Sequence, residues 1–78
     1  MNAQSRWMEI KRRFPDLVVI VRENGHYLTM NEDCPAVFGS GVHCLAEGDQ
    51  MAILIPPDRM DEVYSRLSGF SFVVLEES

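Results

Sequence analysis

The stretch Ile10-Lys-Arg-Arg-Phe-Pro-Asp-Leu-Val-Val-Ile-Val-Arg-Glu-Asn-Gly-His-Tyr27 decides the fold, because it holds a helix end, a strand and a turn. Pro15 cannot continue a helix and disfavours the helical conformation of the residue before it, so the first helix is expected to end there. Residues 17–21 form an unbroken aliphatic run that is too short to span a membrane. Such a run is typical of a strand covered on both faces. Asn24-Gly25 then supplies the positive φ angles of a tight hairpin turn.

The residues before this stretch predict an amphipathic helix over 3–13, with Asn2 placed to cap its start. Its apolar positions follow i, i+4, i+7, i+11 spacing and form one stripe: Ala3, Trp7, Ile10 and Phe14. Arg6, Arg12 and Arg13 lie off this stripe. A basic helix face of this kind is most often a solvated one.

The residues after the turn predict a second strand and a short helix. His26–Met30 is expected to return as a strand with alternating side chains and one buried face. Residues 31–33 form a polar helix-start signal, and Pro35 suits a first helical position. The helix expected over Pro35–Phe38 is therefore little more than one turn, ended by the glycines that follow.

The second half predicts another strand pair, a helix and a final strand. Val42–Glu47 and Gln50–Ile55 flank a tight turn at Gly48-Asp49. A helix opened by Pro56-Pro57-Asp58 then carries an apolar stripe: Met60, Val63, Tyr64 and Leu67. Gly69 fits a left-handed cap at the end of this helix. Phe70–Leu75 is the last predicted strand, and an acidic tail follows it.

The predicted order is therefore α-β-β-α-β-β-α-β. Helices that alternate with strand pairs favour an α/β fold, an α+β sandwich in which a small mixed β-sheet has helices packed on it. A chain of 78 residues with 46% hydrophobic content is long enough for one domain with a modest core, so residues 1–78 are expected to form a single domain.

The charge is acidic overall and unevenly spread. The formal net charge is −5, with a balance of +2 over residues 1–30 and −7 over residues 31–78. Lys11 is the only lysine. Phosphate binding needs basic side chains clustered on one face, so this balance argues against strong autonomous binding of nucleic acid. Cys34 and Cys44 are too few for a disulfide scaffold and indicate reduced thiols in a cytoplasmic protein, and neither a signal peptide nor a membrane span is expected.

No motif in the sequence indicates catalysis. A phosphate-binding loop is absent from it, and the soft metal ligands do not have zinc-site spacing: His26, Cys34, His43 and Cys44. A cysteine–histidine nucleophile pair lacks an orienting third group, and the paired carboxylates at Asp61-Glu62 are better explained as solvated charges. We expect neither an enzyme, a cofactor nor a metal site.

Several residues of the opening stretch resemble a known family. Ile10-Lys11, Phe14-Pro15-Asp16, Arg22, and Gly25 followed by Tyr27 resemble the start of the N-terminal mismatch-recognition domain of the DNA mismatch-repair protein MutS. The resemblance continues weakly over residues 7–77. It implies a mixed α/β fold and an association with DNA.

The sequence departs from this family at the mismatch-reading motif. Mismatch-reading members carry Phe-x-Glu just after the turn, with the phenylalanine stacked on the mispaired base and the glutamate hydrogen-bonded to it. The matching positions here are His26 and Leu28, with Tyr27 between them. His26 retains an aromatic ring that can stack on a base, whereas Leu28 cannot accept a hydrogen bond. True mismatch readout is therefore predicted to be lost.

Two functions follow from the sequence. The first is a non-catalytic DNA-repair-type module that binds double-stranded DNA weakly. Its phosphate contacts would come from Arg6, Lys11, Arg12 and Arg13, and its groove contacts from His26 or Tyr27. A core or cross-strand position explains Tyr27 equally well. The alternative is a protein–protein interaction or regulatory module, or a self-associating one, that has lost nucleic-acid binding. An exposed apolar patch or an open sheet edge would support this alternative, and a uniformly polar surface would count against it.

Overall fold

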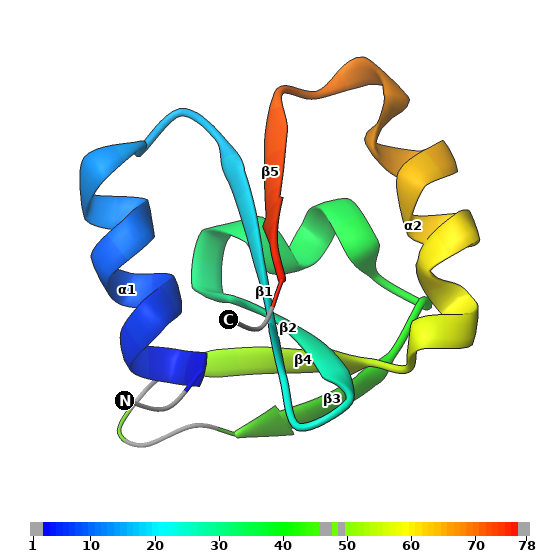
Figure 1. Cartoon of the computed structure of the whole chain (residues 1–78), viewed down its shortest axis with the longest axis horizontal. Coiled ribbons are helices and arrows are strands. Elements are labelled where there is room, and N and C mark those ends of the chain that lie inside the picture. Colours follow the sequence, from blue (N-terminus) through cyan, green and yellow to red (C-terminus); the bar gives the residue numbers. More distant parts are fainter. Residues whose placement is uncertain (1–2, 46–47, 49, 77–78) are drawn as a thin grey trace.

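The computed structural model describes residues 3–45, 48 and 50–76 (Figure 1). The predicted cap at Asn2 and the predicted strand end and turn at Glu47 and Asp49 lie outside these residues. The elements in chain order are α1 (Ala3–Arg13), β1 (Val18–Glu23), β2 (His26–Met30), the 3₁₀ helix η1 (Asn31–Val37), β3 (Val42–Leu45), β4 (Met51–Ile55), the 3₁₀ turn η2 (Pro57–Arg59), α2 (Met60–Arg66), the 3₁₀ turn η3 (Leu67–Gly69) and β5 (Phe72–Leu75).

The strands form one five-stranded sheet in the order β3-β4-β2-β1-β5. β1 pairs with β5 in parallel, and the other neighbours are antiparallel. The mixed sheet and the α+β class are therefore as the sequence predicts. β2 lies at the centre of the sheet, whereas β3 and β5 are its two edges.

Helices cover both faces of the sheet. In Figure 1, α1 lies on one side of β1 and β5 and α2 on the other. The core against α1 is built around Trp7, Val19 and Met30. The core on the opposite face contains residues of η1 and α2, such as Val37 and Val63. The molecule thus has three layers with a hydrophobic core on each side of the sheet.

The prediction that β2 buries only one face is wrong. Residues 27–30 of this strand are all buried. The alternation is lost because β2 is the central strand, with α1 packed on one of its faces and η1 and α2 on the other. The side chains on both faces of a strand in this position are buried, even in a mixed sheet.

The hairpin turn and the end of α1 are confirmed, whereas the burial of Phe14 and the cap at Gly69 differ from expectation. Asn24 and Gly25 have φ angles of 55° and 79°, as a tight turn between twisted antiparallel strands requires.

Phe14 follows the end of α1 and is 49% exposed, so it does not continue the buried stripe. Gly69 is not left-handed. Instead, α2 ends through the 3₁₀ turn η3, which is closed by a 2.9 Å hydrogen bond from the Phe70 N–H to the Leu67 carbonyl.

Two predicted boundaries also shift. The helix expected over Pro35–Phe38 begins earlier, at Asn31, and is a 3₁₀ helix over Asn31–Val37. The last strand begins at Phe72 rather than at Phe70. The acidic residues before Pro35 therefore belong to the helix, and Asp33 is buried there rather than exposed at its start.

Candidate functional site

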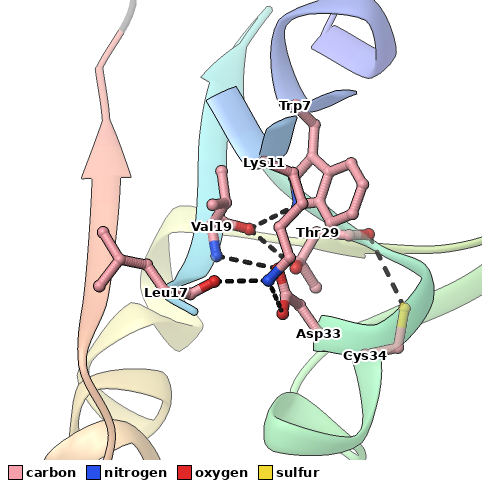
Figure 2. Close-up of polar contacts among 7 residues, drawn as sticks. All are labelled: Trp7, Lys11, Leu17, Val19, Thr29, Asp33 and Cys34. Carbon is pink, nitrogen blue, oxygen red and sulfur yellow. Dashed lines mark hydrogen bonds and ion pairs between the residues drawn. The ribbon is translucent and has the colours of Figure 1, made fainter. Parts of the chain in front are cut away.

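Lys11, one of the four predicted phosphate ligands, is buried in an ion pair. Its Nζ lies 2.8 Å from Asp33 Oδ1 and donates a second hydrogen bond to the Leu17 carbonyl at 2.6 Å (Figure 2). Lys11 is 9% exposed and Asp33 is 4% exposed. The predicted phosphate contact by Lys11 is therefore wrong for this fold, because its ammonium group faces the interior and already has a carboxylate partner.

The same network satisfies the backbone of Val19 (Figure 2). Asp33 Oδ2 accepts a 3.0 Å hydrogen bond from the Val19 N–H. The Val19 carbonyl accepts hydrogen bonds from Trp7 Nε1 at 2.7 Å and from Thr29 Oγ1 at 2.9 Å. Residue pairing between β1 and β2 begins only at Val21, so side chains take the place of the missing strand partner at Val19. This network holds the fold together and presents no group to a ligand.

Tyr27 is also buried, with its hydroxyl in a second polar cluster at the end of β5. It donates a 3.0 Å hydrogen bond to Glu76 Oε2. Arg22 forms an ion pair with Glu76 Oε1 at 3.0 Å, and its guanidinium lies 5.2 Å from the centre of the Tyr27 ring. The predicted groove contact by Tyr27 is therefore wrong, and the alternative core position is the one observed.

Arg6 belongs to this second cluster. Its guanidinium donates to the Arg22 carbonyl at 2.8 Å and to the Glu76 carbonyl at 3.1 Å. The cluster thus ties the end of β5 to α1, β1 and β2. Arg6 is half-buried and its two hydrogen bonds hold it on the protein surface, so binding a phosphate would compete with them.

The charged cluster shifts three pKa values, of which that of Arg22 is raised chiefly by its hydrogen bond to Glu76. The hydrogen bond from Arg22, followed by that from Tyr27, lowers the pKa of Glu76 below its ordinary value. Burial, followed by the hydrogen bond to Glu76, raises the pKa of Tyr27. The shifts of Glu76 and Tyr27 favour a glutamate anion and a neutral tyrosine at neutral pH.

The three remaining predicted DNA ligands are exposed but do not share a surface. Arg12 and Arg13 lie in the last turn of α1, which is joined by a short loop to the start of β1. His26 lies beyond the other end of β1, where its Nδ1 is 3.2 Å from the Asn24 carbonyl oxygen. Six strand residues span about 20 Å. The predicted ligands are therefore divided between the two ends of the strand.

An apolar surface at β5 was not predicted. It consists of Tyr64 of α2, Phe70, and the strand Phe72–Leu75, and we call it the β5 edge. Phe70 is 54% exposed, Tyr64 43% and Phe72 36%. The Tyr64 and Phe72 rings contact each other, with centroids 5.9 Å apart. The sequence placed Tyr64 in a buried stripe, and nothing in the local pattern indicated that the last strand would lie at an edge of the sheet.

A scan against models of protein families finds no match for this chain, and a search of curated proteins finds none either. Within residues 3–45, 48 and 50–76, no helix is both long and apolar enough to cross a membrane. Over the same residues, no group of three or more His, Cys, Asp or Glu side chains is arranged to hold a metal ion. A functional assignment therefore depends on the geometry described above.

The buried ion pair generates a stability prediction. Asp33→Ala removes the carboxylate partner of Lys11 and the acceptor of the Val19 N–H. It is expected to lower the free energy of unfolding by about 3–5 kcal/mol, as found when one partner of a buried pair is removed. Urea denaturation followed by circular dichroism measures this loss. Asp33→Asn, which keeps an acceptor for Val19, should cost less.

The matched control for this prediction is Glu62→Ala. Glu62 forms exposed ion pairs with Arg59 at 3.2 Å and Arg66 at 3.5 Å. Its loss should cost no more than about 1 kcal/mol, because exposed pairs contribute little. If Asp33→Ala costs no more than Glu62→Ala, the pair does not have the structural role assigned to it.

The lowered pKa of Glu76 generates a pH prediction. Because the folded state favours the carboxylate, its contribution is present above the unfolded pKa, whose ordinary value is 4.5, and is lost as pH falls through the lower folded-state value. Glu76→Gln should therefore be less stable than the wild type at pH 7, and the two should converge as the pH falls below this window. Thermal unfolding from pH 7 to pH 3 tests this, and a constant difference across that range would contradict it.

Proposed function

We propose that this chain is a non-catalytic protein-interaction module that binds its partner along the β5 edge. The observation that carries the proposal is an open strand edge flanked by three exposed aromatic side chains. Exposed apolar patches and unpaired edges are the surfaces through which proteins recruit another chain. In this proposal the fold presents the β5 edge to a partner, and a hydrophobic core packs against each face of β5.

The backbone of β5 offers an array of unused hydrogen-bonding groups. The Val18 N–H donates to the Ser71 carbonyl at 2.9 Å, so the carbonyl of Ser71 faces β1. Backbone groups of successive strand residues point in opposite directions, so those of Phe72 and Val74 face away from the sheet. An added strand would use these N–H and C=O groups, as in β-strand addition.

Residues 71–75 contain none of the devices that usually protect an edge. Natural edge strands carry lysines, prolines, inward charges or bulges that prevent pairing with another chain. The sequence Ser-Phe-Val-Val-Leu has no charge and no proline. Its side chains from Phe72 to Leu75 are at least partly exposed. These properties support an edge that is kept available for pairing.

The charge distribution favours a protein partner over DNA. Of the six predicted DNA ligands, Lys11 and Tyr27 are buried and Arg6 is engaged with β1 and Glu76. The net charge of −5 also repels a phosphate backbone. We further propose a reducing, cytoplasmic location, because two cysteines in 78 residues are too few for a disulfide scaffold.

A labelled peptide tests the proposal. The probe is a capped, fluorescein-labelled six-residue peptide of alternating valine and lysine, which is extended, soluble and opposite in charge to the chain. Its anisotropy is expected to rise on titration with the wild type. The rise should be lost with Val74→Pro, because proline removes an outward N–H without breaking a bond to β1.

The matched control is Met51→Lys, which changes an exposed apolar side chain on β4, away from the β5 edge. This variant should bind the peptide as the wild type does. Equal binding by the wild type and Val74→Pro, or no binding by the wild type at concentrations at which it is monomeric, would overturn the proposal.

Weak binding to double-stranded DNA is the second candidate function, and one observation favours it. His26 is exposed just after the hairpin turn, at the position where the resemblance to the MutS mismatch-recognition domain places the stacking phenylalanine. In this candidate, Arg12 and Arg13 would contact phosphates from the other end of β1. It is a backbone binder without mismatch readout, since Leu28 replaces the hydrogen-bonding glutamate and is itself buried.

Anisotropy titrations with matched and mismatched duplexes at low and physiological salt test this candidate. DNA binding predicts equal affinities for both duplexes, a loss at higher salt, and weakening in Arg12→Ala/Arg13→Ala. The control Arg59→Ala/Arg66→Ala removes the same charge from η2 and α2. Absence of binding at low salt would leave the protein-interaction proposal alone, whereas equal weakening by both pairs would indicate nonspecific attraction.

A further inference from the structure

We infer that the partner of the β5 edge is a second copy of this chain, paired antiparallel with the first about a two-fold axis that passes beside Val73. The inference rests on the proposed function and names its partner. Figure 1 shows β5 between α1 and α2, so an added strand would continue the sheet between the two helical layers.

The direction of the backbone groups limits the register. The outward groups on β5 belong to Phe72 and Val74, as the bond between Val18 and Ser71 requires. Two copies can exchange hydrogen bonds only where outward residues face outward residues. A two-fold axis beside Val73 places Phe72 of each copy opposite Val74 of the other. The two Val73 residues then face each other as a non-hydrogen-bonded pair.

A register with the two-fold axis beside Val74 is disfavoured by contacts that Glu76 already makes. In that register, the backbone of Glu76 would have to pair with Phe72 of the other copy. The Glu76 carbonyl already accepts a hydrogen bond from Arg6 at 3.1 Å, and its side chain is held by Arg22 and Tyr27. The axis beside Val73 leaves this cluster intact.

Side chains match across this axis on both faces of the sheet. Val74 packs against the core on the α2 side, and the Phe72 ring contacts Tyr64 on α2. Val73 and Leu75 pack against the core on the α1 side. Pairing would therefore place Phe72 against Val74 on one face and Val73 against Val73 on the other. The two cores of each copy would become continuous with those of its partner.

Charge does not oppose this arrangement despite the acidity of the chain. Residues 71–75 carry no charge, so no like-charged side chains face each other within the paired segment. The nearest acid, Glu76, is neutralised within its own copy by Arg22 at 3.0 Å. An identical strand matches this segment, because it is equally uncharged and apolar. Two-fold self-complementarity of this kind is the commonest form of oligomer interface.

Sedimentation equilibrium and light scattering across a concentration series provide the first test. The wild type is expected to show a monomer–dimer equilibrium, Val74→Pro to remain monomeric, and Met51→Lys to dimerise as the wild type does. Circular dichroism confirms that each variant is folded. A wild type that stays monomeric at every concentration overturns the inference, and so does a Val74→Pro variant that dimerises normally.

Disulfide trapping tests the register. The background variant is Cys44→Ser. Non-hydrogen-bonded antiparallel partners have Cα atoms about 4.5 Å apart, a separation that a disulfide can span. Val73→Cys is therefore expected to form a covalent dimer on mild oxidation. Leu75→Cys, whose opposite residue is Ser71 of the other copy, should not. Trapping of Leu75→Cys but not Val73→Cys would overturn the two-fold register.

The two proposals fail separately. Binding of the valine–lysine peptide to a chain that is monomeric at all concentrations would overturn the second copy as partner and leave the protein-interaction function supported. A monomeric chain that also fails to bind the peptide would overturn both.

Discussion

The contact on which the rest of the structure depends is the buried pair of Lys11 and Asp33 beside Val19. β1 and β2 form an antiparallel hairpin but separate before Val19, so the backbone there would be left without hydrogen bonds inside the core. An unsatisfied buried backbone group costs about 1–3 kcal/mol. The Asp33 carboxylate accepts a hydrogen bond from the Val19 N–H, and Lys11 balances its charge. The Val19 carbonyl accepts hydrogen bonds from Trp7 and Thr29. One residue of β1 is thus held by α1, β2 and η1 together.

The side of β1 away from β2 pairs with β5. Because α1 is fixed by Trp7 and Lys11 on one face, β1 can receive the last strand in parallel along its outer side. Arg6, Arg22, Tyr27 and Glu76 then anchor the far end of that strand. The two polar clusters use most of the basic side chains of the first half, which explains why the positive balance of that half does not produce a basic surface.

Local sequence patterns predicted where the helices, strands and turns lie, but not which of them pack together. The proline after α1, the Asn24-Gly25 turn and the aliphatic run of β1 each act through backbone preferences, and the structure has them where the sequence placed them. The burial of Lys11 could have been suspected, since it lies four residues after Trp7 on the same side of the helix. Its partner could not have been named, because Asp33 is brought to it by a change of chain direction at Asn31, where φ is 48°.

The candidate site was missed for the same reason. Whether a strand is central or at an edge depends on long-range pairing, and Val73–Leu75 has the same aliphatic character as the buried residues Val18–Val21 of β1. Tyr64 matches a buried helical stripe in spacing, yet it lies on the side of α2 that faces β5, where no further strand covers it. The predicted phosphate contact by Lys11 was wrong because a one-dimensional pattern does not show which charges find partners inside the fold.

The parallel pairing of β5 with β1 joins residues from opposite ends of the chain. Val18 lies beside Phe72, so the intervening chain must be brought together before this ladder can form, which carries an entropic cost that a hairpin avoids. β5 also has the most exposed side chains of the strands whose burial is described. β5 therefore combines a costly long-range pairing with side chains that are already partly exposed. Its transient release would leave the outer side of β1 unpaired, so the sheet has a second, hidden edge that opens only by local unfolding.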